Sequence, residues 1–135
     1  MQTVIITRTL PGDVAAVWSY LSQPQLLSAW FTPVDTVTIG TTFNVKLDKI
    51  EVTASVTKLI NSSLIEFSVS ATDGTLGLIV LRIKQNTGRI ELTVMDGTLQ
   101  TTTFIDKLFY KINMNKRKSF WHSKLNALEY RLEQG

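Results

Sequence analysis

Hydrophobic periodicity changes twice along this chain, and the order of these changes limits the folds that it can adopt. A segment rich in Thr, Val and Ile from Gln2 to Thr9 favours a β-strand, and Pro11 and Gly12 end it. Helical spacing follows, because Asp13 is a good N-cap and the pattern behind it continues to about Ser22. The apolar stripe of this first helix consists of Val14, Val17, Trp18 and Leu21.

A second short helix is expected directly after the first. Pro24 suits a first helical turn, where its missing N–H costs nothing, and Pro33 ends the element. We expect Trp18 and Trp30 to hold the two helices against the end of a sheet. The buried side of the second helix is predicted to consist of Leu26, Leu27 and Trp30.

After Gly40 the apolar residues recur at every second position. Phe43, Val45 and Leu47 alternate with polar residues, which predicts a half-buried antiparallel strand. Turn residues separate four further segments of this kind, so the short connections favour a meander of hairpins. The four segments are Glu51 to Ile60, Ser63 to Ser70, Thr75 to Lys84 and Arg89 to Met95.

The carboxyl-terminal part returns to helical spacing. Extended back to Phe104, this helix would be roughly 45 Å long, which exceeds what a domain of this size usually covers. We therefore predict a break near Asn113 to Asn115, with a short amphipathic helix or ordered loop before it. An amphipathic helix and a one-sided sheet can cover each other, and a curled sheet leaves room for a cavity between them. The apolar face of the final helix holds Trp121, Leu125, Leu128 and Leu132.

Composition excludes several classes of protein. At 135 residues, 44% hydrophobic and 19% charged, the chain suits a single folded domain that covers residues 1–135. The absence of cysteine excludes disulfides, thiolate nucleophiles and cysteine-bound metals. No apolar run approaches the roughly 20 residues that span a bilayer, and no secretory signal is visible. We expect a cytoplasmic protein without a membrane span or a cofactor.

Positive charge is concentrated toward the carboxyl terminus. From Thr98 onward seven Lys and Arg residues stand against three acids, a net charge of +4, while residues 1–97 carry −1. Lys116, Arg117 and Lys118 form the densest basic cluster, which could face nucleic acid or an anionic membrane. The polar residues around them are equally those of a solvated helix start, so we do not expect a nucleic-acid partner.

These elements resemble a known superfamily. The order of one strand, two helices, antiparallel strands and a long final helix is similar to that of the SRPBCC (START-like, birch-pollen-allergen-like) superfamily. Within it, the branch of the activator of heat-shock protein 90 ATPase is the most similar. The chain departs from that branch at two places. Gly12 and Asp13 stand where members of the branch often have Ala-Pro, and the segment Thr98 to Asn115 matches no sequence pattern of the branch. The matching residues are Val17, Trp18, Leu21, Pro24, Leu27, Trp30, Phe31, Pro33, Gly40, Phe43, Trp121, Leu125 and Leu128.

The resemblance implies an α+β helix-grip fold. In this fold a curved antiparallel β-sheet wraps around a long carboxyl-terminal helix, and two short helices follow strand one, in the order β-α-α-β-β-β-β-β-α. Members of the superfamily bind lipids, sterols, polyketides and plant hormones in a pocket between sheet and helix, and some are cyclases or hydroxylases.

Few residues are candidates for catalysis. His122 is the only histidine and has no second histidine with which to bind a metal, so a structural role is favoured. Apolar residues alternate with Glu66 and Glu91 along their predicted strands, so both glutamates are expected to face solvent. Arg82 lies on a strand that is apolar on both faces, so it either anchors an anionic group in the cavity or reaches water. Nothing here predicts a catalytic residue, and a binding protein is expected rather than an enzyme.

We therefore expect a protein that binds a small hydrophobic or lipid-like ligand between sheet and helix. Two alternatives follow from the resemblance: a chaperone-associated interaction module like the heat-shock protein 90 ATPase activator, and a polyketide cyclase-like enzyme. The candidate cavity residues are Trp30, Phe31, Phe43, Phe67, Leu78, Val80, Arg82, Leu92, Trp121 and Leu125.

Overall fold

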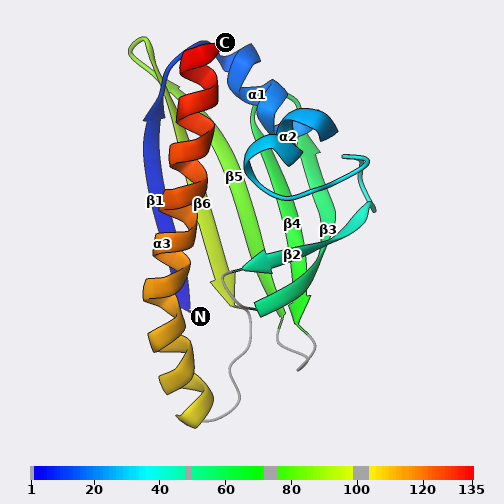
Figure 1. The fold of residues 1–135 in the computed structure, drawn as a ribbon, viewed down its shortest axis with the longest axis vertical. Helices are drawn as coiled ribbons and strands as arrows, with labels where there is room; N and C mark the ends of the chain where they lie inside the picture. The colour runs from blue at the N-terminus through cyan, green and yellow to red at the C-terminus, as the bar shows by residue number, and fades with distance from the viewer. Residues whose placement is uncertain (1, 48–49, 72–75, 99–103) are drawn as a thin grey trace.

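Six antiparallel strands form one curved sheet in the order β1-β6-β5-β4-β3-β2, as drawn in Figure 1. The computed structural model describes the backbone of residues 2–47, 50–71, 76–98 and 104–135. Strands β2 to β6 follow one another as a meander, and β1 closes the order by pairing with β6, which confirms the expected topology. The strands are β1 (Gln2–Leu10), β2 (Thr42–Leu47), β3 (Ile50–Ile60), β4 (Leu64–Ala71), β5 (Leu76–Asn86) and β6 (Arg89–Thr98).

Two short helices, α1 (Val14–Ser22) and α2 (Pro24–Trp30), connect β1 to β2. The side chain of Asp13 accepts a hydrogen bond from the backbone N–H of Ala16 at 2.8 Å, which is the expected N-cap of α1. The indole Nε1 of Trp30 donates to the backbone carbonyl of Tyr20 at 2.9 Å and so ties α2 to α1. Trp30 is buried and Trp18 packs on the core from a partly buried position, as expected for residues that hold these helices in place.

The final helix, α3, runs without interruption from Phe104 to Gln134, so the predicted break near Asn113 to Asn115 is wrong. The prediction assumed that the whole helix must lie on the sheet. Instead, the first turns of α3 extend past the ends of the strands (Figure 1), and no Gly or Pro lies within the helix to end it. The side chains of residues 104–114, which include the predicted amphipathic piece, lie outside the described residues. No helix in the described part of the chain is both long enough and apolar enough to cross a bilayer.

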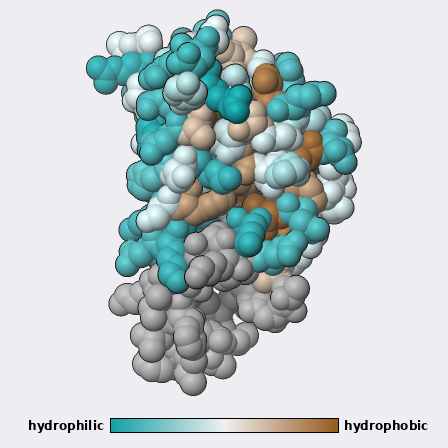
Figure 2. Space-filling view, in the orientation of Figure 1, coloured by the Kyte–Doolittle hydropathy of each residue, from teal (hydrophilic) through white to brown (hydrophobic). Residues whose placement is uncertain are grey.

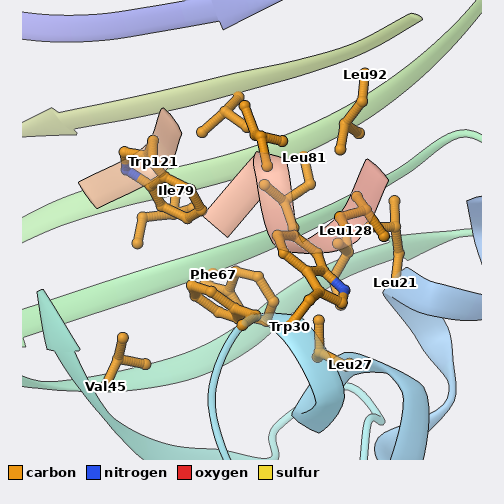
Figure 3. Packing of buried hydrophobic residues seen from close by; sticks show 14 of the residues in the cluster. Leu21, Leu27, Trp30, Val45, Phe67, Ile79, Leu81, Leu92, Trp121 and Leu128 are labelled. Carbon is orange, nitrogen blue, oxygen red and sulfur yellow. The ribbon is translucent and has the colours of Figure 1, made fainter. Parts of the chain in front are cut away.

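The core lies between the concave face of the sheet and α3. Period two places Phe67 of β4 beside Ile79 of β5, and Ile65 beside Leu81, and all four side chains are fully buried. Figure 3 shows Phe67, Ile79 and Leu81 near the side chains of α3 and α2 that close this core. From α3, the fully buried residues are Trp121, Leu125 and Leu128.

A glycine is required where β5 approaches β6 closely. A Cβ on Gly77 would lie 2.6 Å from the carbonyl oxygen of Gly97 and 3.0 Å from Cγ2 of Val69. We expect Gly77→Ala to lower the free energy of unfolding by about 1–3 kcal/mol, because the strands must separate to admit the methyl group. Urea denaturation measures this change. Ser70→Ala, an exposed change of similar size on the neighbouring strand, should change it by less than about 0.5 kcal/mol, and equal effects of the two variants would contradict the prediction.

Candidate functional site

A buried carboxylate lies on the concave face of the sheet, beneath α3. Asp96 is fully buried and shares a row with Val4 of β1 and Ile79 of β5. Its Oδ2 accepts a hydrogen bond of 2.9 Å from Nε1 of Trp121, and its Oδ1 lies 3.7 Å from Nη1 of Arg117. Among the described residues, Oδ1 has an ion-pair partner but no hydrogen-bond partner. Such an oxygen retains an unused capacity to accept a hydrogen bond.

Local sequence explains this placement. On β6 the alternation that buries Ile90, Leu92 and Val94 continues to Asp96, so its side chain has to point toward the core. On α3, residues four positions apart share a face, and so Arg117 and Trp121 reach the same carboxylate.

Sequence reasoning missed Asp96 because it ended this strand at Met95. The structure continues β6 to Thr98. Extending the period of two by a single residue would have indicated a carboxylate on the apolar face of the sheet.

An aromatic cluster adjoins this carboxylate and connects α3, the end of α2 and the sheet. The ring of Phe31 stacks on Trp121 with centroids 5.3 Å apart and an interplanar angle of 17°. The ring centroid of Phe31 also lies 5.6 Å from that of Trp30 and 6.0 Å from that of Phe67. Phe43 of β2 meets Phe67 edge-to-face at 5.5 Å. The aromatic cluster (Trp30, Phe31, Phe43, Phe67 and Trp121) thus leads from α3 across the sheet to the partly exposed Phe43.

The concave face has small side chains next to the row that contains Asp96. In the adjacent row Gly77 of β5 pairs with Val69 of β4, Val69 pairs with Ala54 of β3, and Ala54 pairs with Phe43. This small-residue row (Gly77, Val69 and Ala54) carries short side chains, whereas the row that contains Asp96 carries Ile79 and Phe67. On the face shown in Figure 2, apolar residues reach the surface between α3 and the side of the fold that carries α2 and β2.

The predicted cavity residues separate into two groups. Trp30, Phe31, Phe67, Leu92, Trp121 and Leu125 are buried in the core beneath α3, and Phe43 packs against that core from a partly buried position. Leu78, Val80 and Arg82 lie on the opposite face of the sheet, away from α3, and their placement in a cavity under α3 is wrong. The physical reason is the alternation along β5, which turns Ile79, Leu81 and Ile83 inward instead.

The remaining candidate residues do not converge on Asp96. His122 is exposed on α3, where its Nδ1 lies 3.2 Å from Nη2 of Arg8; Nη1 of Arg8 donates to Oδ1 of Asn126 at 2.8 Å. These contacts tie the edge strand β1 to α3.

Glu66 and Glu91 lie on strand positions that face away from α3, as predicted. Of the basic cluster, Arg117 turns toward Asp96 while its two lysine neighbours are exposed. No group of potential metal ligands occurs among the described residues.

Comparison with known proteins shows similarity in structure alone. No family model matches the sequence, and neither does any curated protein. MLL2253 from Mesorhizobium loti is 15% identical, with a TM-score of 0.81 over 98% of each chain. DynU16, from the dynemicin biosynthetic locus, is 19% identical with a TM-score of 0.78; the match covers 97% of this chain but 47% of DynU16. The Aha1 dimer from Colwellia psychrerythraea is 18% identical, with a TM-score of 0.68 over 96% of this chain and 97% of that one.

These similarities agree with the element order and with the position of α3 against the concave face of the sheet. The TM-scores show a shared fold, while identities below 20% carry no information on function, which has to be argued from the residues of the site. The chain therefore has the helix-grip topology and shares its fold with these solved structures.

Proposed function

We propose that this protein binds a small, largely apolar molecule between the concave face of the sheet and α3. The observation that carries the proposal is the buried Oδ1 of Asp96, which has no hydrogen-bond partner among the described residues. Leaving such an acceptor without a partner costs about 1–3 kcal/mol, and most buried polar groups in folded proteins have a partner. A bound molecule that donates to Oδ1 removes this cost.

The surroundings of Asp96 support a mainly apolar ligand. Binding sites for small molecules are usually lined by apolar and aromatic side chains, with a few polar groups that fix orientation. The aromatic cluster supplies such a lining, and the partly exposed Phe43 offers an approach from solvent. The small-residue row places short side chains on the sheet next to the row of Asp96, where a ligand meets little steric hindrance.

The described residues favour binding over the two alternatives from the resemblance. A cyclase-like enzyme needs polar groups that converge on a substrate, yet His122 is exposed on α3 and Arg82 is exposed on the far face of the sheet. A chaperone-associated role rests on the similarity in fold to the Aha1 dimer structure, which is 18% identical. A buried acceptor beside an aromatic cluster has no evident use in such an interaction, whereas a small ligand uses both.

A titration with 2-naphthol followed by ¹H–¹⁵N NMR tests the proposal. We expect saturable shifts of the Trp121 indole N–H and of the amides of Ala54 and Val69, with little change at Leu64 and Val80 on the opposite face. Ala54→Leu adds bulk to the small-residue row and should weaken binding about tenfold, the effect of losing roughly 1.4 kcal/mol of binding free energy.

Ala15→Leu, the same change at an exposed position of α1, is the matched control and should leave binding unchanged. Thermal unfolding of both variants shows whether each is folded. No saturable shift with 2-naphthol, together with a ligand-free native mass of the freshly purified protein, would contradict the proposed function.

A further inference from the structure

We infer that the molecule bound at this site is a neutral aromatic compound whose hydroxyl group donates a hydrogen bond to Oδ1 of Asp96, and that anionic lipids such as fatty acids are excluded. The inference rests on the proposed function and adds the chemical class of the ligand. It follows from the charges at the site and from the shape of its apolar lining.

The polar end of the site is a carboxylate. An ionised carboxylate accepts hydrogen bonds and donates none, so its partner has to supply an O–H or N–H. A ligand carboxylate placed near Oδ1 would bring two negative charges together in a fully buried position, where weak screening makes their repulsion large. Fatty acids and other carboxylates are therefore unsuitable occupants.

Arg117 does not reverse this preference. Its Nη1 lies 3.7 Å from Oδ1, so its positive charge already interacts with Asp96. A ligand anion would have to compete with Asp96 for this arginine. A ligand cation would bring a further positive charge into a buried position beside Arg117. A neutral donor adds no charge to the site and satisfies Oδ1.

The apolar lining favours a flat ring over a flexible chain. Phe31 and Trp121 stack nearly parallel on each other, and Phe43, the partly exposed member of the aromatic cluster, meets Phe67 edge-to-face, so a ligand that enters beside Phe43 packs against aromatic rings. A planar aromatic molecule can lie against such surfaces and loses little conformational freedom on binding. The small-residue row beside Asp96 provides a sheet surface against which a flat ring can pack.

Three probes with the same ring system separate the contribution of the hydroxyl donor from those of ligand charge and of the apolar ring. We would measure the dissociation constants of 2-naphthol, 2-naphthoate and naphthalene at pH 7 by isothermal titration calorimetry and by NMR. We expect 2-naphthol to bind about tenfold more tightly than naphthalene, which lacks the donor, because a hydrogen bond to a charged group has a net value of that order. The binding of 2-naphthoate should be weaker than that of naphthalene, because its charge opposes that of Asp96.

Asp96→Asn identifies the residue responsible. The side chain keeps its shape and can still accept from Trp121, while its amide nitrogen can donate to a ligand carboxylate. We expect the preference for 2-naphthol over 2-naphthoate to fall about tenfold or to reverse. Glu91→Gln makes the same chemical change on the same strand but on the opposite face, and should leave the preference unchanged. Circular dichroism verifies that both variants are folded.

The outcomes separate the inference from the proposed function. Equal binding of the three probes, or preferred binding of 2-naphthoate, would overturn the inference while the proposed function stands. Failure of all three probes to bind would overturn the inference, and a ligand-free native mass of the freshly purified protein in addition would overturn the proposed function as well. The ranking of the probes on the unaltered protein decides the ligand class even if Asp96→Asn fails to fold.

Discussion

Trp121→Ala is expected to lower the free energy of unfolding by about 4–5 kcal/mol. Trp121 is fully buried, stacks on Phe31 and donates to Asp96. Its removal leaves a large cavity, which by itself costs about 3–5 kcal/mol for an aromatic residue, and it also leaves Oδ2 of Asp96 without its donor. Urea denaturation followed by far-ultraviolet circular dichroism measures the change without depending on tryptophan fluorescence.

Two further variants separate packing from hydrogen bonding. Trp121→Phe keeps a ring against Phe31 and removes the N–H, so we expect a smaller loss, about 2–3 kcal/mol. Tyr130→Ala on the same helix removes an aromatic side chain that is 62% exposed and should change stability by less than about 0.5 kcal/mol. A loss of less than about 1 kcal/mol for Trp121→Ala would contradict the role of Trp121 as the central anchor of α3.

Arg117→Gln is expected to lower the free energy of unfolding by about 3 kcal/mol. The substitution leaves the buried carboxylate of Asp96 without its compensating charge, and breaking one side of a buried ion pair typically costs about 3–5 kcal/mol. The lower end of that range applies because the Arg117 side chain is partly exposed and its 3.7 Å approach to Oδ1 is an ion pair without a hydrogen bond. Urea denaturation of the unaltered protein and of Arg117→Gln measures this change in the free energy of unfolding.

A double-mutant cycle with Asp96→Asn identifies the cause. Once the negative charge is absent, the loss of Arg117 should cost less, and a coupling free energy of about 1–3 kcal/mol is expected. Lys118→Gln removes an exposed positive charge from the neighbouring position and should have an effect below about 0.5 kcal/mol. Additive effects of Arg117→Gln and Asp96→Asn would show that Arg117 stabilises the fold through contacts other than the one with Asp96.

Two predictions from the sequence failed for identifiable physical reasons. Both faces of β5 are apolar, so the alternation of Ile79 with Val80 cannot show which face α3 covers. The predicted helix break assumed that the whole helix lies on the sheet, whereas α3 continues past the ends of the strands. In both cases local periodicity was correctly recognised, and the error concerned what lies against it.

The sequence by itself determined the elements and their order. Period two, helical spacing and the cap at Asp13 act over a few residues, so they can be recognised without knowing the partners of each segment. The inward direction of Asp96 also belongs to this local information, since it continues the alternation of β6. The tertiary structure alone decided that Asp96 meets Arg117 and Trp121, and that Phe31 lies between Trp121 and Phe67. In each of these contacts the two partners lie on different parts of the fold. The contacts depend on where α3 and α2 pack on the sheet, and that packing is set by the burial of the whole apolar surface rather than by any single segment.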